Sequence, residues 1–236
     1  PDNIDEFVGR GVVSQDQVRL IKGSGVDVST FEPSQQPAGP PIIILASRLV
    51  WDKGVKEFVE AAQILKQSGT EARFVLVGKS DTLNPNAVPE ERLKDWDRDG
   101  PVEWWGFQED MPSVFANVHA VCLPSYYREG VPKVLIEAAA CERPIVTTDM
   151  PGCREIVRDG ENGLLVPPAD GQAVADAVIQ LLEDAELRAK MGDQGRSLVQ
   201  KEFSVERVVE KTVEVYRGIL QKKRSRTTSI TTNPTA

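Results

Sequence analysis

The sequence predicts an α/β fold: a doubly wound parallel sheet of the Rossmann type. Strand-like and helix-like segments alternate between residues 42 and 166. The run Ile42–Ala46 is apolar throughout, as in a strand that is buried on both faces of a sheet. The segment Val55–Lys66 repeats its apolar residues at helical spacing. Because such alternation requires parallel strands joined by right-handed crossovers, the order of elements predicts this fold.

The individual elements follow from the same periodicities and from the turn residues between them. The expected strands are Ile42–Ala46, Phe74–Val77, Val102–Trp105, Ala120–Leu123, Ile145–Thr148 and Gly163–Val166. The expected helices are Val55–Lys66, Arg92–Arg98, Met111–Asn117, Lys133–Cys141, Ala173–Leu182, Ala185–Glu202 and Val205–Leu220. A helix within residues 1–13 and a strand at Val18–Ile21 are expected before the sheet, and Ser204 is expected to cap the last helix.

These elements divide the chain into four parts. Residues 1–22 are expected to be a remnant of a preceding domain, and residues 23–41, rich in Gly, Ser and Pro, an interdomain linker. Residues 42–223 form the Rossmann-like domain, and the Ser- and Thr-rich residues 224–236 are expected to be disordered. Because the chain begins with Pro1 rather than Met, we expect it to be a fragment or a processed form.

Composition limits the function further. The chain has 236 residues, 40% hydrophobic and 27% charged, which is enough for one sizeable core. The formal net charge of −8 argues against general nucleic-acid binding. No signal peptide is recognisable, and no apolar stretch approaches the ~20 residues of a membrane-spanning helix. The basic residues near the C-terminus, which we interpret as a solvated tail and alternatively as a contact with an anionic membrane, are Lys222, Lys223, Arg224 and Arg226.

The cysteine and histidine content disfavours several kinds of site. Cys122, Cys141 and Cys153 form an odd set without metal-ligand spacing, which favours free thiols in a reducing compartment. His119 is the only histidine, so neither a Ser/His/Asp triad nor a His-based metal site can be built, and we expect His119 to be structural. The absence of a Walker A motif, and of a Gly-x-Gly-x-x-Gly after any strand, disfavours NTP hydrolysis and hydride transfer.

The most informative segment is PSYYREGVPKVLIEAAACERPIVTTD, residues 124–149. It holds two carboxylates, Glu129 and Glu137, separated by seven residues. Pro132 suits the first turn of a helix, so Glu129 is expected in the preceding loop and Glu137 more than one turn inside the helix. A helix N-terminus favours an anion, and carboxylates accept hydrogen bonds from hydroxyls. A ligand with both a phosphate and many hydroxyls, such as a sugar nucleotide, suits this combination.

Two cations, Arg48 and Lys53, follow the first buried strand in the segment ASRLVWDKG. Ligands of doubly wound sheets bind outside the carboxyl ends of the strands, where this segment is expected. A leaving diphosphate needs cations that stabilise its developing charge, and Arg and Lys supply a planar fork and a compact charge. From the residues alone, two solvated surface cations are the ordinary alternative.

Together these motifs resemble those of the family 4 retaining glycosyltransferases, which have the two-domain GT-B fold. The Glu-x7-Glu spacing, the small residues 138–140 that follow, and the segment PGCREIV at residues 151–157 all stand where that family has them. The Arg-x4-Lys spacing matches as well, and so does Gly-x-Gly-Val-Asp-x-x-x-Phe over residues 23–31. The resemblance runs from about Gly23 to Leu220 and implies that the chain is the C-terminal, donor-binding half of such an enzyme.

The resemblance implies a role for each candidate residue. Arg48 and Lys53 would hold the diphosphate, and Glu137 would accept hydrogen bonds from both ribose hydroxyls. Glu129 would position the donor sugar and, with Arg48 and Lys53, is a catalytic candidate. One departure is Ser47, where many family members have Gly; its small side chain should preserve the loop.

The remaining donor-binding candidates would act mainly through their backbone. Those implied near the sugar and the phosphates are Gly130, Val131, Pro132, Val134 and Leu135. Those implied near the nucleobase are Gly78, Gly106 and Phe107.

The implied reaction is transfer of a sugar from a nucleotide-diphosphate sugar, expected to be a UDP-sugar, to a hydroxyl with retention at the anomeric carbon. The leaving diphosphate itself would take the acceptor proton. No cofactor and no metal are expected, because the two cations and the helix dipole would replace the metal. Two rivals are a UDP-sugar epimerase of the same architecture, which the single histidine disfavours, and a non-catalytic nucleotide-sugar-binding module.

The segment YREGVPKVLIEA, residues 127–138, is similar in sequence to the same region of bacterial enzymes that build lipopolysaccharide, capsule or other surface polysaccharides. The acceptor is therefore expected to be a glycan or a polyprenyl-linked sugar, held mostly by a missing N-terminal domain. A cytoplasmic location follows, with peripheral contact at the inner face of the plasma membrane as an open alternative.

Overall fold

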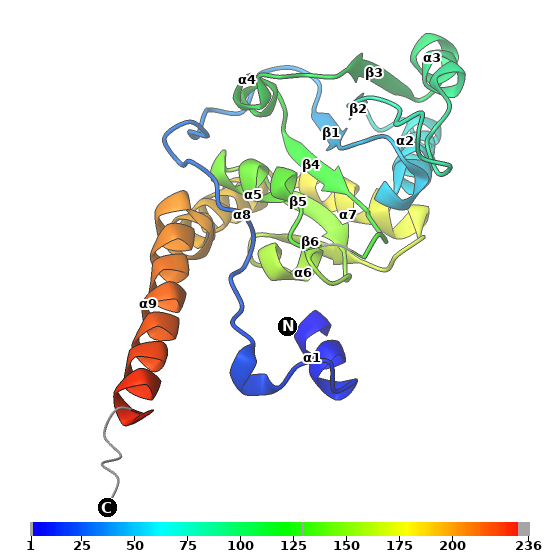
Figure 1. The fold of residues 1–236 in the computed structure, drawn as a ribbon. Coiled ribbons are helices and arrows are strands. Elements are labelled where there is room, and N and C mark those ends of the chain that lie inside the picture. Colours follow the sequence, from blue (N-terminus) through cyan, green and yellow to red (C-terminus); the bar gives the residue numbers. More distant parts are fainter. Residues whose placement is uncertain (1, 129, 231–236) are drawn as a thin grey trace, which may run out of the picture.

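A computed structural model describes residues 2–128 and 130–230 of the chain. Its centre is one six-stranded parallel sheet with the order β3-β2-β1-β4-β5-β6 (Figure 1). The strands are β1 (Ile42–Ala46), β2 (Arg73–Val77), β3 (Val102–Gly106), β4 (Ala120–Leu123), β5 (Ile145–Thr148) and β6 (Gly163–Val166). This order and the flanking helices confirm the predicted doubly wound α/β fold.

Helices connect the strands and close the chain. The α-helices of the described residues are α1 (Asp2–Gly9), α2 (Val55–Ser68), α3 (Glu90–Asp99), α4 (Met111–Ala116), α5 (Lys133–Ala140), α6 (Cys153–Ile156), α7 (Gly171–Glu183), α8 (Ala185–Leu198) and α9 (Val205–Ile230). Two short 3-10 turns, η1 (Gln15–Gln17) and η2 (Trp51–Lys53), and a π-helix, η3 (Val199–Phe203), complete the set. Helix α2 packs beside α7, and α5 beside α8.

All six predicted strands of the sheet are present, but other predictions were wrong in detail. Val18–Ile21 is not a strand, because no neighbouring strand in the described chain offers it hydrogen bonds. The expected helix Ala185–Glu202 divides at Val199, where the π-helix η3 begins. Helix α9 continues to Ile230, so residues 224–230 are helical rather than disordered; residues 231–236 lie outside the described part. The short helix α6 was not predicted.

The strand order reverses between β1 and β4, which pair in parallel at the centre of the sheet. From β1 the chain proceeds outward to β2 and β3, and from β4 it proceeds outward to β5 and β6. Connections that leave in opposite directions open a crevice at the carboxyl ends of the two central strands, and ligands bind there in this kind of fold. The motifs after β1 and after β4 therefore meet at this switch point.

The segment predicted to be a linker is held along the side of the sheet domain. Three arginines that lie far from it in sequence donate hydrogen bonds to it. Arg196 Nη2 donates to the Val28 carbonyl at 2.9 Å, and Arg143 Nη2 to the Ser34 carbonyl at 3.0 Å. Arg188 Nε donates to the amide oxygen of Gln36 at 3.1 Å. We call residues 26–37 the strap.

His119 fastens the end of the strap, in agreement with its predicted structural role. Its Nδ1 accepts the backbone N–H of Ile42 at 3.0 Å, which leaves the proton of the neutral ring on Nε2. Nε2 lies 3.0 Å from the carbonyl oxygen of Pro37 and donates to it. Burial lowers the pKa of His119, the hydrogen bond to Pro37 partly opposes that shift, and Arg188 and Arg143 lower the pKa further, which favours the neutral ring.

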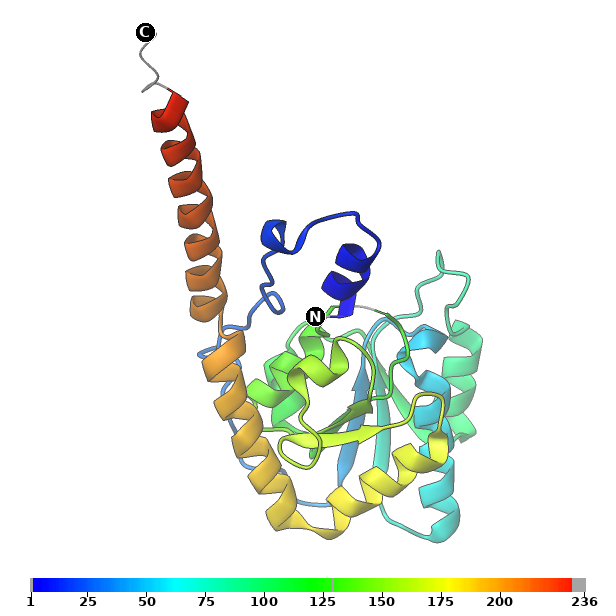
Figure 2. The same cartoon turned by 90° about the horizontal axis from the view of Figure 1, so that it is seen from below.

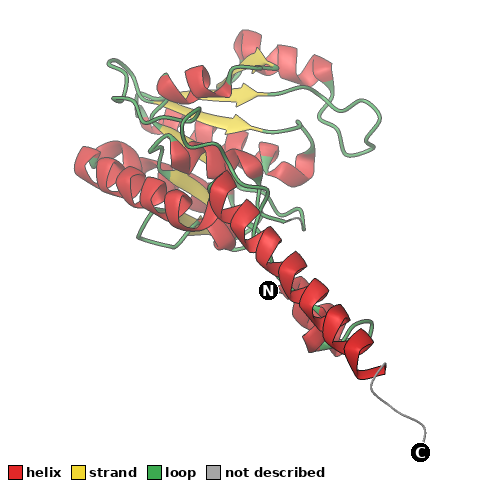
Figure 3. Cartoon of the chain, turned by 60° about the vertical axis from the view of Figure 1, so that its left-hand side comes forward, coloured by secondary structure: helices red, strands yellow, loops and turns green. Residues whose placement is uncertain are grey.

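Helix α9 projects away from the sheet domain as a single long rod (Figures 2 and 3). Its beginning is anchored to the sheet domain: the backbone N–H of Val205 donates to the Val26 carbonyl at 3.0 Å, and the Val26 N–H donates to the Phe203 carbonyl at 2.9 Å. Within residues 2–128 and 130–230, no helix combines the length and the apolar character needed to cross a membrane.

Candidate functional site

The loop after β1 and the loop after β4 are joined at one atom, the backbone carbonyl oxygen of Asp52. It accepts the hydroxyl of Ser125 at 3.2 Å and the backbone N–H groups of Tyr126 and Tyr127 at 3.0 and 3.1 Å. Ser125 is itself held from β5, since the Thr148 hydroxyl donates to its carbonyl. Strand ends that are far apart in sequence thus form one fixed surface at the switch point.

Gly54 makes this close approach possible. It ends η2 and precedes α2 with a φ of 78°, in the left-handed region that favours glycine. A Cβ atom at this position would overlap the backbone carbonyl of Pro124. The sequence Lys53–Gly54 therefore brings the start of α2 against the end of β4.

The two cations of the predicted clamp stand at this edge in different surroundings. Lys53 is only 7% exposed, and its Nζ lies 5.4 Å from the centre of the Tyr127 ring. Arg48 is 60% exposed on its side chain, and its Nη1 lies 3.1 Å from Oδ2 of Asp81. The structure brings both cations to the carboxyl edge of β1. An anion placed there would meet Lys53 in a drier environment than Arg48, and charge interactions are stronger where water is excluded.

Glu137 lies inside α5, as predicted, and the structure shows that it is buried. Lys133, one helical turn earlier, places its Nζ 3.2 Å from Oε1 of Glu137. Burial raises the pKa of Glu137, and the hydrogen bond from Lys133 partly opposes that shift. A buried carboxylate of this kind gains from ligand hydroxyls that donate hydrogen bonds to it.

The loop that leads into α5 is only partly described. Glu129 lies outside the described residues, so its position is not part of the site as built here. Pro132 caps α5, and Gly130 and Val131 precede it at the same edge. The backbone N–H of Leu135 donates to the Pro132 carbonyl at 3.1 Å, so the expected phosphate contact of Leu135 has no free donor. Val134, the residue before it, keeps the position expected for such a contact.

Two residues that were expected near the nucleobase, Gly78 and Phe107, lie in different surroundings. Gly78 uses both backbone groups internally: its N–H donates to Gly106 at 2.7 Å, and its carbonyl accepts Trp104 Nε1 at 2.9 Å. A Cβ atom on Gly78 would overlap the Ser47 carbonyl, so this glycine is needed for the close approach of the chain after β1 to the end of β2. Phe107 is exposed, and the ammonium of Lys79 lies 4.5 Å from its ring centre.

Sequence reasoning missed the segment Ser80–Val88 as part of the site. Besides Asp81, which pairs with Arg48, it supplies Asn86, whose Nδ2 donates to the Asp52 carboxylate at 3.1 Å. The Ser80 hydroxyl closes the segment on the Val88 carbonyl at 2.6 Å. The only signal in the sequence was Pro85, a residue typical of loops, which does not show what the loop contacts.

The described part of the chain brings together no group of three or more His, Cys, Asp and Glu side chains with metal-site geometry. The three cysteines are buried free thiols. At this switch point two cations, a buried carboxylate and a helix N-terminus line one edge, a combination suited to a ligand with an anionic diphosphate and a diol.

Comparison with known proteins identifies the family. A family model described as Glycosyl transferases group 1 matches residues 29–198, more than half of the chain. The chain belongs to this family. The matched residues include the loop after β1 and the loop after β4. One curated relative is the capsular polysaccharide biosynthesis glycosyltransferase CapM from Staphylococcus aureus, which is 29% identical over 180 residues that cover 76% of this chain and 47% of the relative.

One relative is N,N'-diacetylbacillosaminyl-diphospho-undecaprenol alpha-1,3-N-acetylgalactosaminyltransferase from Campylobacter jejuni. It is 31% identical over 199 residues, which cover 79% of this chain and 50% of the relative. The group 1 chain thus spans about half the length of this curated relative.

Solved structures share the fold. Sucrose-phosphate synthase from Thermosynechococcus elongatus superposes with a TM-score of 0.79 at 28% identity, covering 94% of this chain and 57% of that one. HepE from Anabaena, solved in complex with UDP, gives a TM-score of 0.76 at 21% identity, covering 90% and 60%. The latter likeness is one of fold alone.

Proposed function

We propose that this chain is the donor-binding part of a retaining glycosyltransferase that takes a sugar from a UDP-sugar. One observation carries the proposal: the loops after β1 and β4 are fused through the Asp52 carbonyl, so Lys53 and the N-terminus of α5 face the same crevice. A diphosphate in that crevice would contact a poorly solvated cation and a helix N-terminus together. Family membership supports the transfer of a sugar.

The chain's own residues suggest how the donor is handled. Lys53 and Arg48 stabilise the negative charge that grows on the leaving diphosphate, an effect largest for groups already in place. Glu137 accepts hydrogen bonds from both ribose hydroxyls and so holds the nucleoside at a fixed distance from the two cations. Glu129, by the family resemblance, positions the donor sugar. The bond from the anomeric carbon to the diphosphate breaks, the acceptor oxygen bonds to that carbon on the same face, and the diphosphate takes the acceptor proton, so the anomeric configuration is retained.

The donor and the acceptor are inferred from relatives. The structure of HepE was solved with UDP, and the Campylobacter relative is named for N-acetylgalactosamine transfer to an undecaprenyl diphosphate-linked sugar. We propose a UDP-hexose or UDP-N-acetylhexosamine as donor and a glycan or polyprenyl-linked acceptor for this protein too. We propose a cytoplasmic location, with peripheral contact at the inner face of the plasma membrane as the alternative if the acceptor is polyprenyl-linked.

Calorimetric titration with UDP tests the site. Arg48→Ala and Lys53→Ala are each expected to weaken UDP binding by about 1.5–3 kcal/mol, the range for hydrogen bonds to charged groups. Lys53→Ala should have the larger effect because Lys53 is the more buried cation. The matched control is Arg98→Ala, an exposed arginine on α3 that pairs with Asp95 and Asp99. Unchanged UDP binding in both site variants would refute the clamp.

The carboxylates and the metal are tested in the same titration. Glu137→Ala should weaken UDP and UDP-sugar equally, because its partner is the ribose, whereas Glu129→Ala should weaken only the UDP-sugar. Binding should persist in EDTA, since the two cations and the helix N-terminus neutralise the phosphates. An absolute requirement for Mg²⁺ or Mn²⁺ would contradict this metal-independent arrangement.

The transfer reaction is tested by adding the rest of the protein. Orientation of two substrates supplies up to roughly 7–11 kcal/mol of a reaction barrier. A chain half as long as its relative should lack much of the acceptor side. We expect the 236-residue chain to bind UDP without measurable transfer, and a version with a preceding domain to transfer sugar. Product analysis of the longer version also separates transfer from epimerisation and from binding alone.

A further inference from the structure

The segment Ser80–Val88, which follows β2, is held firmly against the loop after β1. The backbone N–H of Leu49 donates to the Lys79 carbonyl at 2.9 Å, and the Trp51 N–H donates to the Asn86 carbonyl at 2.9 Å. These backbone hydrogen bonds, near the two ends of the segment, fix its position relative to the β1 loop. A side chain of the segment that contacts this loop therefore acts from a fixed support.

Asp81 is such a side chain, and it contacts Arg48. Arg48 Nη1 lies 3.1 Å from Oδ2 of Asp81. The Asp81 side chain is 27% exposed and that of Arg48 is 60% exposed, so the carboxylate is the more enclosed partner. The Asp81 carbonyl accepts the backbone N–H of Asn84 at 2.8 Å, which closes a turn at this residue. The long arginine side chain is thus tethered to a short carboxylate whose backbone is already fixed.

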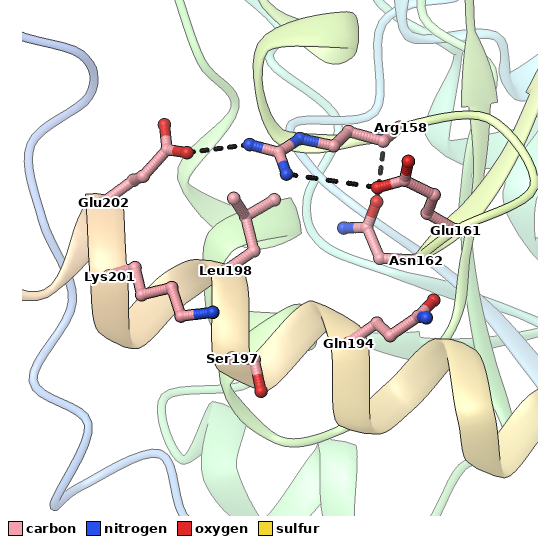
Figure 4. A pocket seen from close by; sticks show the side chains of 8 residues that line it. All are labelled: Arg158, Glu161, Asn162, Gln194, Ser197, Leu198, Lys201 and Glu202. Carbon is pink, nitrogen blue, oxygen red and sulfur yellow. Dashed lines mark hydrogen bonds and ion pairs between the residues drawn. The ribbon is translucent and has the colours of Figure 1, made fainter.

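A second cluster, away from the switch point, contains an arginine that is paired through both of its terminal nitrogens (Figure 4). Arg158 Nη2 lies 2.7 Å from Oε1 of Glu202, and Arg158 Nη1 lies 3.9 Å from Oε2 of Glu161. These side chains line a cavity of about 190 Å³. In the part of the chain that the structure describes, Arg48 is paired through Nη1 alone. Its Nη2 and Nε are therefore available to other acceptors.

The tether favours phosphate binding because Arg48 is long and exposed. An exposed arginine loses side-chain conformational freedom when it binds a phosphate, and two parallel hydrogen bonds require a defined orientation. A partner that already restricts the guanidinium reduces this cost before the ligand arrives. The opposing effect is repulsion between the Asp81 carboxylate and the diphosphate, which water and salt screen at an exposed position. Preorganisation is therefore the larger effect.

We propose that Asp81 is a positioning residue of the diphosphate site. It holds Arg48 through Nη1, so that the edge formed by Nη2 and Nε is kept in place for the diphosphate of the donor. Asp81 itself does not contact the donor. This inference rests on the proposed function and adds the segment Ser80–Val88 to the support of the cations.

Calorimetric titration of the 236-residue chain with UDP tests the positioning role. Asp81→Ala should weaken UDP binding about fivefold, which is about 1 kcal/mol and the upper end of the range for exposed ion pairs. The variant should fold, because the loss of one exposed pair changes stability little. Asp81→Asn keeps an oxygen in the same place and should stay within about twofold of the parent. The matched control is Glu202→Ala, which removes the partner of Arg158, an arginine of similar exposure, and it should bind like the parent.

The same titration in an Arg48→Ala background separates positioning from a general effect on the fold. If Asp81 acts through Arg48, Asp81→Ala should have no further effect once the arginine is removed. A substitution that disturbs the whole segment Ser80–Val88 would instead weaken UDP binding by the same factor in both backgrounds.

The inference is overturned if Asp81→Ala binds UDP as tightly as the parent or more tightly, if Asp81→Asn binds as weakly as Asp81→Ala, or if the loss persists in the Arg48→Ala background. A parent that does not bind UDP, or an Arg48→Ala variant that binds it like the parent, would refute the diphosphate role of Arg48 and with it this inference. If the parent binds UDP, Arg48→Ala weakens that binding and Asp81→Ala matches the parent, only the positioning role fails.

Discussion

Helices α5 and α9 both have apolar side chains, but those of α5 are buried and several of those of α9 are exposed. In α5, every residue from Leu135 to Ala140 is buried between the sheet and α8. In α9, Val209, Tyr216 and Ile219 are all more than half exposed. Apolar spacing therefore predicts that a face exists, but not that this chain covers it. Under the proposed function, we expect a preceding domain to cover the exposed apolar face of α9.

The largest expected effect concerns the crowded end of α2. Gly54 and Gly69 bound the same helix with nearly equal φ values of 78° and 75°, but only Gly54 faces another backbone. Gly69→Ala should cost about 1–2 kcal/mol of unfolding free energy, the cost of left-handed backbone alone. Gly54→Ala adds a clash with Pro124 and should cost about 2–5 kcal/mol. Equal midpoints in urea unfolding for the two variants would mean that the β1 and β4 loops are not tightly fused.

The next effect concerns the fastening of the strap. His119→Phe removes the bonds to Ile42 and Pro37 and should cost about 1–3 kcal/mol near pH 8. The pH profile gives a second readout. Because the folded pKa of His119 is lowered below the unfolded value of about 6.5, the parent loses stability as the pH falls through that value.

In His119→Phe this acid-dependent loss should be absent, so the stabilities of parent and variant converge as the pH falls toward 5. Urea midpoints of the two proteins between pH 5 and pH 8 provide the measurement. A constant difference across that range would show that the pKa of His119 is the same in the folded and the unfolded chain.

A smaller effect on stability is expected from a substitution of Glu137, and it should stabilise the chain rather than destabilise it. Its folded pKa is raised, so it contributes stability when protonated and loses it as the pH rises above the unfolded value. Glu137→Gln should therefore stabilise the free chain slightly at pH 8 and have little effect near pH 4, by thermal unfolding. The same variant should bind UDP more weakly. A destabilised variant at pH 8 would indicate that the Lys133 pair outweighs burial.

The smallest effect tests the comparison between the helices directly. Ile219→Thr on α9 should change the unfolding free energy by no more than about 0.5 kcal/mol, as for most surface substitutions. Ile136→Thr on α5, the matched buried control, should cost about 2–4 kcal/mol, because it leaves a cavity and buries a hydroxyl. In a longer protein with the preceding domain, Ile219→Thr should become destabilising. A large effect in the present chain would instead indicate that α9 is already covered, for example by a second copy.

The sequence by itself determined the six strands of the sheet, the doubly wound class, and the placing of Arg48, Lys53 and Glu137 beside the switch point. These features depend on local periodicity and on short spacings between neighbouring residues. Neither depends on the path of the rest of the chain. It also indicated the family through its motifs, and the family match agrees.

Only the tertiary structure decided the partners that come from distant parts of the chain. The pairing of Arg48 with Asp81, the three donors on the Asp52 carbonyl and the arginines that hold the strap each join residues more than 30 positions apart. The hydrogen bonds of Gly78 to Gly106 and Trp104 are likewise set by how β2 and β3 pair in the sheet. Such contacts depend on the path of the whole chain, because a donor or acceptor bonds to whatever group the packed structure places within reach.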